Sequence, residues 1–426
     1  MVQRPIPTSW NVYNLLRSPF FQQPLESGEQ TPRPLSLFVG REAELKRLRG
    51  TIHGAGENAT VQAIAGAPGV GKTTLVKELK ALALEDGYLT TDSYVAILPN
   101  DTPEGLFGRV LGALYDTILA NRPQSGDNSA MADAKVLVRA TRLTSGGITL
   151  TIPGIGGIGG THGTSVVTPK DLLIDGPRVM RDLTRMVQTS DARGTLLHLN
   201  NLENLSESDA MRAAEILRAL RDIMLLHNGL HYVLVGTADA VNMAVNTHAQ
   251  VRSIVGTLVL APFTIDEVHA LLRARYDHLR VDPTRPAMSP VDANAAATLY
   301  DFFRGDLRGL LKALEDGVGV LIGLDHATAQ PLTLDELRPV LQQGYASELA
   351  ALPEQKRIAQ LTKWGTTAPA SVQTQKSLGT LWQLSQGAVS TAVSYLTRQG
   401  YVVALPRTGT NPIQYVLSGV SRLIFG

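Results

Sequence analysis

The residues best suited to chemistry lie in one glycine-rich stretch, residues 66–73, with the sequence GAPGVGKT. The stretch fits the pattern G-x-x-x-x-G-K-[ST], follows an apolar run and precedes residues with helical spacing. In this setting backbone N–H groups surround a phosphate at the positive end of a helix. We expect Lys72 to reach the β- and γ-phosphates and the Thr73 hydroxyl to bind Mg²⁺. The stretch predicts a site for ATP or ADP with Mg²⁺, formed by Gly66, Pro68, Gly69, Val70, Gly71, Lys72, Thr73 and Thr74.

Alternating strands and helices indicate how these residues are positioned. Short apolar strands that alternate with helices predict a parallel sheet covered on both faces, hence an α/β fold. Ligands of such sheets bind beyond the C-terminal strand ends, where we expect Asn200, Asn201 and Thr237. The strands and intervening helices are predicted at 93–98, 103–120, 194–203, 208–226, 232–237 and 258–260. The first of these helices is expected to bury Phe107, Val110, Leu111, Leu114 and Ile118.

Residues 144–167 depart from this alternation. Ile148, Leu150 and Ile152 alternate with small polar residues, and a glycine run follows at 154–160. Alternation, a glycine turn and a second short apolar stretch predict an inserted β-hairpin that contacts a partner. A glycine-rich loop without strands is the alternative. The run is not a dinucleotide fingerprint, because no helix with an acidic partner follows it in a βαβ frame.

Two further regions flank the predicted sheet. Residues 1–36 are rich in proline and glutamine and carry one aromatic cluster. We expect an N-terminal arm that packs on the first domain, with docking of a partner as the alternative. From Thr264 to about residue 341 the pattern is helical, and Thr264 with Glu267 forms a capping box. The second region therefore predicts a small helical domain.

The last segment, 350–426, has the pattern of a winged helix. Its third helix is capped by Ser385 and is expected to face inward at Val389, Ala392, Val393 and Leu396. Two other helices precede it and two strands follow, with predicted ranges 353–364, 372–382, 401–405 and 413–417. We expect the third helix to enter the major groove of double-stranded DNA while the wing between the strands meets phosphate. The predicted DNA contacts are Gln386, Ser390, Thr391, Ser394, Arg398 and Arg407.

The distribution of charge favours this interpretation of the last segment. From residue 351 onward seven basic residues accompany a single acid, Glu354, which gives +6, whereas the whole chain carries +1. A basic end of this kind points to nucleic acid or another acidic partner. A winged helix that contacts only proteins is the alternative.

Composition narrows the class of protein further. With 426 residues the chain has room for two to four domains. No window reaches the roughly 18 uninterrupted apolar residues of a membrane span, and residues 1–5 have no apolar signal segment. The absence of cysteine excludes disulfides, thiol catalysis and cysteine-ligated zinc. We therefore expect a cytoplasmic protein with no membrane partner.

Taken together, the motifs resemble those of AAA+ ATPases of the replication-initiator group, the origin-recognition and Cdc6-like proteins, and neighbouring bacterial AAA ATPases. Phe38 and Val39, within the sequence FVGRE, resemble the family's opening box near the adenine, and residues 66–73 match its Walker A motif. The resemblance covers roughly residues 37–426 apart from the insertion. It implies a P-loop AAA+ parallel-sheet domain (37–262 with 144–167 inserted), a helical lid (263–345) and a C-terminal winged helix (350–426), preceded by the arm (1–36).

The same resemblance implies roles for several further residues. Thr237 is placed like the sensor-1 residue that contacts the γ-phosphate, and Arg308, in the sequence GDLR, resembles the sensor-2 arginine. Residues 261–264 with Arg275 resemble the entry into the lid. Arg252 falls where a subunit-bridging arginine finger is expected, which implies a homo-oligomer or a partner protein. Ordinary surface positions are the alternative for Arg308 and Arg252.

One departure from the family pattern bears on catalysis. The Walker B strand of the family ends in Asp-Glu, whereas Asn200 and Asn201 stand here. An amide has neither the charge that helps hold Mg²⁺ nor a base that activates water. Glu203 can substitute as the catalytic carboxylate only if the strand end bends. We therefore expect nucleotide binding with weak or absent hydrolysis.

Two functional hypotheses follow, and a competent motor ATPase is a third possibility. In the first, bound nucleotide is a switch for assembly and for DNA binding through the winged helix. In the second, the chain is a STAND-like signalling or assembly ATPase of bacterial defence or transposition, whose winged helix and hairpin bind protein partners.

Overall fold

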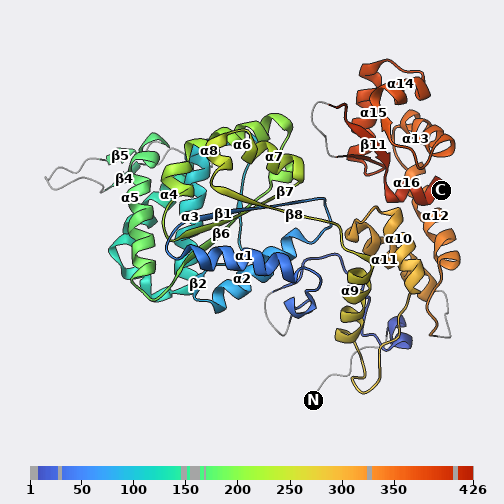
Figure 1. The fold of residues 1–426 in the computed structure, drawn as a ribbon, viewed down its shortest axis with the longest axis horizontal. Helices are drawn as coiled ribbons and strands as arrows, with labels where there is room; N and C mark the ends of the chain where they lie inside the picture. Colours follow the sequence, from blue (N-terminus) through green and yellow to red (C-terminus); the bar gives the residue numbers. More distant parts are fainter. Residues whose placement is uncertain are drawn as a thin grey trace. The chain divides into compact units, whose positions relative to one another are not determined.

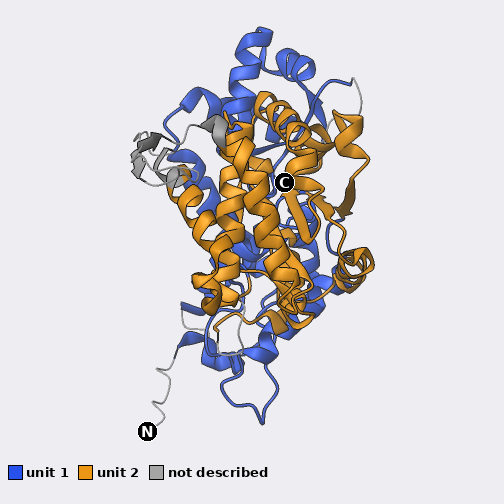
Figure 2. Ribbon diagram, turned by 90° about the vertical axis from the view of Figure 1, so that its left-hand side faces the viewer, with its two compact units in different colours: residues 1–24, 67–70, 261–426 blue, residues 25–66, 71–260 orange. Residues whose placement is uncertain are grey.

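The computed structural model describes residues 8–26, 31–144, 151–153, 164–166, 169–323, 329–405 and 411–425. The chain forms two compact units, coloured separately in Figure 2. The sheet unit comprises residues 25–66 and 71–260, and the lid unit comprises residues 1–24, 67–70 and 261–426. No helix in the described ranges is long and apolar enough to span a bilayer.

A parallel sheet forms the centre of the sheet unit (Figure 1), in the order β2-β6-β7-β1-β8 with β3 beside β6. All of its pairings are parallel. β1 and β7 are buried along their whole length, as expected of a parallel sheet whose two faces are covered. This arrangement confirms the predicted α/β class. The strands are β1 (Thr60–Gly66), β2 (Tyr88–Leu89), β3 (Val95–Ala96), β6 (Gly194–Asn200), β7 (Leu230–Gly236) and β8 (Val255–Leu260).

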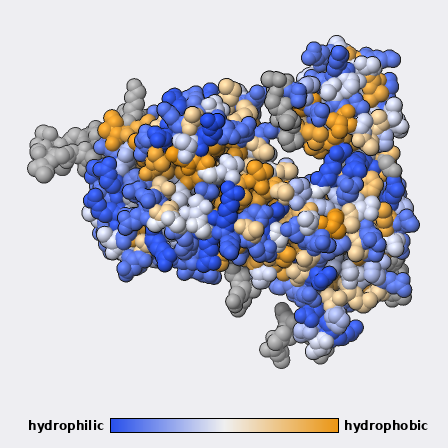
Figure 3. Space-filling view, viewed as in Figure 1, coloured by the Kyte–Doolittle hydropathy of each residue, from blue (hydrophilic) through white to orange (hydrophobic). Residues whose placement is uncertain are grey.

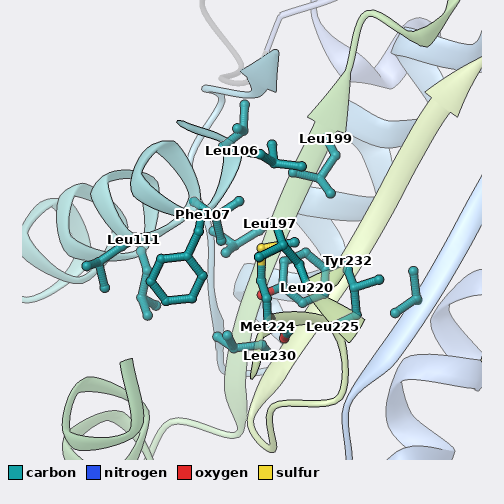
Figure 4. Packing of buried hydrophobic residues seen from close by; sticks show 14 of the residues in the cluster. Leu106, Phe107, Leu111, Leu197, Leu199, Leu220, Met224, Leu225, Leu230 and Tyr232 are labelled. Atoms are coloured by element: carbon teal, nitrogen blue, oxygen red, sulfur yellow. Dashed lines mark hydrogen bonds between the residues drawn. The ribbon is translucent and has the colours of Figure 1, made fainter. Parts of the chain in front are cut away.

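Helices supply the rest of the core of the sheet unit. Figure 4 shows Leu106 and Phe107 of α3 lying beside Leu197 and Leu199 of β6. The predicted core positions of α3 are all fully buried: Phe107, Val110, Leu111, Leu114 and Ile118. The helices are α1 (Glu42–Ala55), α2 (Lys72–Glu85), α3 (Pro103–Asn121), α4 (Ser129–Thr144), α5 (Pro169–Gln188), α6 (Glu207–Ala219), α7 (Ala238–Asn246) and α8 (Ala249–Arg252).

The buried strand expected at 93–98 is wrong in most of its length. Of this run only Val95 and Ala96 pair with β6, and Tyr94 is 58% exposed. The buried ammonium of Lys80 donates to two backbone carbonyls just before β3, at 2.6 Å each, and burial lowers its pKa to about 8. The segment just before β3 thus bonds to a side chain of α2, and β3 itself is two residues long.

The helix expected at 208–226 also ends early. α6 stops at Ala219, and a π-helical turn, Arg221–Leu225, follows it. The hydroxyl of Tyr232, buried in β7, donates to the carbonyl of Met224 in this turn at 3.2 Å. The sheet therefore provides a partner for a carbonyl of the turn.

The inserted segment lies between α4 and α5, two helices that the sequence analysis did not predict. β4 (Thr151–Pro153) and β5 (Thr164–Val166) pair in antiparallel orientation there. The glycine run at 154–160, like Ile148 and Leu150, lies outside the described residues. The full extent of the hairpin and its partner contact stay predictions.

The lid unit contains the helical region and the winged helix. α13, α14 and α15 pack together beside an antiparallel sheet of order β10-β11-β9, and this arrangement confirms the predicted winged helix. Its helices are α9 (Ile265–His278), α10 (Ala293–Phe302), α11 (Leu307–Gly323), α12 (Leu334–Ala350), α13 (Gln355–Thr367), α14 (Gln375–Trp382), α15 (Gln386–Arg398) and α16 (Gly419–Phe425). Its strands are β9 (Gln373–Thr374), β10 (Val402–Ala404) and β11 (Gln414–Leu417).

Cap and core predictions for the lid unit are largely met. Thr264 and Glu267 form the expected capping box of α9. Ser385 stands at the N-cap of α15, but its side chain makes no capping hydrogen bond, so that prediction is wrong in its chemistry. The four inward residues of α15 are buried: Val389, Ala392, Val393 and Leu396. α16 was not predicted.

The N-terminal arm, predicted at 1–36, divides between the two units: from Leu25 on it belongs to the sheet unit, as expected, whereas its earlier part does not. Tyr13, Leu15 and Phe20 are fully buried in the core of the lid unit, with α9, α10 and α11, and not on the first domain. Their aromatic and aliphatic surface completes that core. In Figure 3 hydrophilic side chains cover most of the visible surface of each unit, with hydrophobic ones in smaller groups.

Candidate nucleotide site and nucleic-acid interface

The glycine-rich stretch joins β1 to α2 as a strand, loop and helix. Gly69 and Gly71 have φ angles of +81° and +88°, in the left-handed region that favours glycine. Gly71 is the N-cap of α2, so the backbone N–H groups of its first turn lie at the end of the loop. Thr73 is exposed on that turn and Val70 is buried. This is the local structure that phosphate binding requires.

The tip of the loop, residues 67–70, packs within the lid unit. A Cβ atom at Gly69 would collide with Oδ1 of Asp306 and lie 3.3 Å from the backbone nitrogen of Arg308. The carboxylate of Asp306 caps α11 by accepting from that nitrogen at 2.9 Å, and burial raises its pKa. Sequence reasoning missed Asp306, although an aspartate one residue before a helix is a capping signal.

Gly69 is constrained by its positive φ angle and by its close approach to Asp306, and three glycine substitutions separate the two effects. Gly54→Ala, in open space within α1, is expected to be neutral or stabilising by up to about 1 kcal/mol. Gly56→Ala, in open space at a φ of +60°, is expected to cost about 1 kcal/mol. Gly69→Ala adds the collision with Asp306, and we expect it to cost about 2–3 kcal/mol. Urea unfolding measures all three. Equal costs for Gly56→Ala and Gly69→Ala would contradict the close packing.

Lys72 is a buried cation of the sheet unit, in the first turn of α2. Its Nζ donates to the carbonyl of Gly66 at 3.0 Å and lies 3.3 Å from Oε2 of Glu203. The Lys72 side chain is 6% exposed and that of Glu203 is 38% exposed. A buried ammonium requires such partners, and a γ-phosphate is negatively charged, as the carboxylate is.

A bend at the end of β6 brings Glu203 to this position. Asn201 has a φ angle of +82°, and a 3₁₀ turn, Leu202–Asn204, follows it. The Asn201 amide donates to the carbonyl of Ile97 at 3.0 Å, while its Oδ1 accepts from Asn204. The bend is thus fixed by hydrogen bonds and brings the Glu203 carboxylate beside Lys72, while the catalytic role of Glu203 stays a prediction.

Other predicted site residues of the sheet unit lie at the ends of its strands and helices. Thr237 follows β7 and caps α7, its hydroxyl accepting from the Ala240 nitrogen at 3.3 Å. Asn200 ends β6, which neighbours β7. Arg252 is exposed at the end of α8. Half-buried side chains occupy the remaining positions, Phe38, Val39 and Thr74.

The residues present fit a magnesium ion only together with a nucleotide. Among the residues that the structure describes, no group of three or more histidine, aspartate and glutamate side chains could hold a metal ion. A protein site built from carboxylates alone is therefore not available there. The exposed hydroxyl of Thr73 and the phosphates of a nucleotide would supply ligands, as in other phosphate-loop sites.

The outward face of α15 is the candidate nucleic-acid interface. Gln386, Thr391, Ser394 and Arg398 are exposed, and Ser390 is half-buried. Arg398 lies over the ring of Tyr395 at 5.8 Å from its centroid. Arg407, predicted on the wing, lies outside the described residues.

These features define the class of the nucleotide-binding domain. Residues 37–235 match the family model of the AAA ATPase domain, and this segment contains the phosphate loop, β1, β6 and β7. The match confirms the resemblance predicted for that domain.

Several solved structures resemble the whole chain at low identity. The Aeropyrum pernix ORC2 protein with ADPNP and ADP is 16% identical, with a TM-score of 0.48 and coverage of 95% of each chain. The Aeropyrum pernix ORC1 protein in complex with DNA is 14% identical, with a TM-score of 0.44 and coverage of 91% and 92%. A Thermotoga maritima RuvB mutant is 15% identical, with a TM-score of 0.42 and coverage of 91% and 95%. No curated protein matches the chain by sequence. Likenesses at these scores say nothing of what this chain binds.

Proposed function

We propose that this chain is an ATP-binding switch protein that controls assembly and DNA binding, with slow hydrolysis of the nucleotide. The observation that supports it best is Lys72, buried at the start of α2 and held by the carbonyl of Gly66 and the carboxylate of Glu203. ATP would replace Glu203 as the counter-ion of Lys72, and Thr73 would bind the accompanying Mg²⁺. Glu203, once released, would accept a proton from the attacking water.

Slow turnover follows from the donor set. The aspartate that helps hold Mg²⁺ in AAA+ proteins is replaced by Asn200, which carries no charge. A single, part-exposed carboxylate must act without that support. The proposed roles of Thr237 as sensor 1, Arg308 as sensor 2 and Arg252 as a subunit-bridging finger stay predictions of the sequence.

Replacing Lys72 with Ala is the direct test of nucleotide binding. Loss of charge-assisted bonds to phosphate costs about 3 kcal/mol, so we expect affinity for ATP and ADP to fall about 100-fold by calorimetry. Lys77→Ala is the control: Lys77 lies on the same helix but donates to the carbonyl of Leu25 at 2.9 Å. If both variants bind nucleotide like the wild type, the proposal fails.

Charge reversal on the winged helix tests DNA binding. Arg398→Glu with Arg407→Glu is expected to weaken binding to a mixed-sequence duplex about 10-fold or more and to flatten its salt dependence, because two phosphate contacts are lost. Lys356→Glu, at an exposed position of α13, makes the same charge change per residue and should have little effect. Unchanged duplex binding in the double variant would favour the signalling alternative.

That alternative has one observation of its own. The paired strands β4 and β5 form an inserted element between α4 and α5, and such an element suits contact with a protein partner. Deleting residues 145–168 would then abolish assembly while leaving duplex affinity intact, as sedimentation and fluorescence anisotropy can show.

A further inference from the structure

Three arginines gather at the C-terminal end of α10 in the lid unit. Arg422 of α16 donates to the carbonyls of Asp301 and Phe302 at 2.7 and 3.1 Å, and it lies 5.1 Å from the centroid of the Phe302 ring. Arg338 of α12 lies over the same ring at 5.9 Å. Arg304 follows the helix and has a φ angle of +52°, a backbone conformation that residues other than glycine rarely adopt. We call these three side chains the arginine cluster.

Carboxylates neutralise little of this charge. Within the described part of the chain, the carboxylate that contacts the arginine cluster is Asp301, whose Oδ2 lies 3.4 Å from Nη2 of Arg422 and whose side chain is 81% exposed. An ion pair as exposed as this contributes little. Burial, together with the charge of Arg422, lowers the pKa of Arg304. The cluster thus holds like charges close together.

Within the described residues, two of the three arginines make no polar contact, although Arg338 also lies over the Phe302 ring. Arg422 satisfies carbonyls at the end of α10, which is a structural task. Arg304 and Arg338 form no ion pair and no hydrogen bond among the described residues. A hollow of about 540 Å³ lies beside Arg304, between α9 and α10, with Thr298 and Asp301 in its wall. The hollow is open to an external ligand.

We propose that the arginine cluster is a second contact for the phosphates of duplex DNA, next to the winged helix. This inference rests on the proposed DNA binding. Guanidinium groups bind phosphate oxygens in pairs and relieve one another's repulsion by doing so. α16 begins one residue after β11, so Arg422 follows the winged helix directly in the chain. The winged helix exposes Arg398 and the cluster adds three further arginines, and this repeated positive charge favours a long polyanion such as DNA over a short acidic protein segment.

The test compares a double variant with a single control variant of the full chain, and in each the arginines are replaced by uncharged glutamine. Arg304→Gln with Arg338→Gln removes two guanidinium groups and leaves Arg422 to cap α10. Arg285→Gln is the control, because Arg285 is exposed in the lid unit beyond the far end of α9, a helix about 21 Å long whose first residue lines the hollow. Duplex affinity is measured by fluorescence anisotropy over a salt series, with thermal unfolding to establish that each variant is folded.

We expect the double variant to bind duplex about 10-fold more weakly at low salt. The slope of log affinity against log salt should become shallower by about 1.8, at about 0.9 for each phosphate contact. An unchanged slope, or an equal change in Arg285→Gln, would overturn the proposal. If the wild type binds no duplex at all, the proposed function fails with it. If the wild type binds and only the α15 variants weaken it, this inference alone fails. Loss of binding to polyglutamate, with duplex binding unchanged, would assign the cluster to an acidic protein segment instead.

Discussion

Glu203→Gln is expected to lower ATP turnover about 100-fold, to the background of the assay, while ATP affinity stays the same or rises less than 10-fold. The loss follows because an amide cannot accept the proton of the attacking water, and a positioned base contributes about 10²–10⁴-fold. Affinity does not fall, because the Glu203 carboxylate, whose Oε2 lies 3.3 Å from Nζ of Lys72, competes with the γ-phosphate for that ammonium, and the variant removes this competitor. The gain is small since Glu203 is 38% exposed and water screens the pair.

The control for this variant is Glu207→Gln, which removes the same charge from an exposed position in the first turn of α6. Phosphate release at saturating ATP gives the turnover, and calorimetry gives the affinity. Wild-type turnover that survives in Glu203→Gln would place the base elsewhere, for example on a neighbouring subunit. A wild type without any turnover would leave Glu203 as a counter-ion of Lys72 and nothing more.

Restoring the family's carboxylate by Asn201→Glu is not a clean converse experiment. The Asn201 amide donates to Ile97 and its backbone is left-handed, a conformation that asparagine tolerates better than glutamate. The substitution is expected to destabilise the turn by about 1–2 kcal/mol, and with it the position of Glu203.

Arg275→Ala is expected to cost about 3 kcal/mol of the free energy of unfolding, the largest stability effect among these predictions. The side chain is 6% exposed, and its Nη1 donates to the carbonyls of Pro19 and Phe21 at 3.0 and 2.8 Å. Its guanidinium also stacks on the Phe21 ring, 3.9 Å from the centroid, and burial lowers its pKa to about 9. Removing it leaves two carbonyls without their charged donor, at about 1.5 kcal/mol each.

Arg280→Ala is the matched control for Arg275→Ala. Its guanidinium also donates to two carbonyls, those of Asp277 and Pro283, but at the surface, so we expect a change within about 0.5 kcal/mol. Urea unfolding gives the free energies. Trp10 packs edge to face with Phe20 at 5.9 Å, so its fluorescence reports release of the arm. Similar costs for the two variants would show that the arm is not anchored by Arg275.

The sequence predicts the local parts of this molecule well and the long-range ones poorly. The phosphate loop and the buried face of α15 depend on spacing within a few residues, and both could be predicted. The contact of Arg275 with the arm joins residues more than 250 positions apart, and a motif resemblance assigned that arginine to the lid entry alone. The shortness of β3 has no local signal in the sequence, and neither does the burial of Lys80, whose ammonium donates to carbonyls just before that strand.

The bend after β6 is an intermediate case. Two consecutive asparagines at a strand end are compatible with a left-handed residue, so the sequence held a signal. That signal does not show which carboxylate the bend brings next to Lys72, because Lys72 lies on a different element, α2. The sequence therefore supports Glu203 as the carboxylate only if the strand end bends; the turn shows the bend, and the catalytic role stays a prediction.

The path of the chain between its two compact units limits how this protein can be divided or recombined. The chain passes from one unit to the other four times, after Pro24, Gly66, Val70 and Leu260. No single break in the polypeptide separates the units, and a gene fragment that begins at residue 261 would lack Tyr13 and Phe20, which fill its core. Exchange of the winged helix and its lid between homologues would therefore succeed only if the first residues of the chain were exchanged with them.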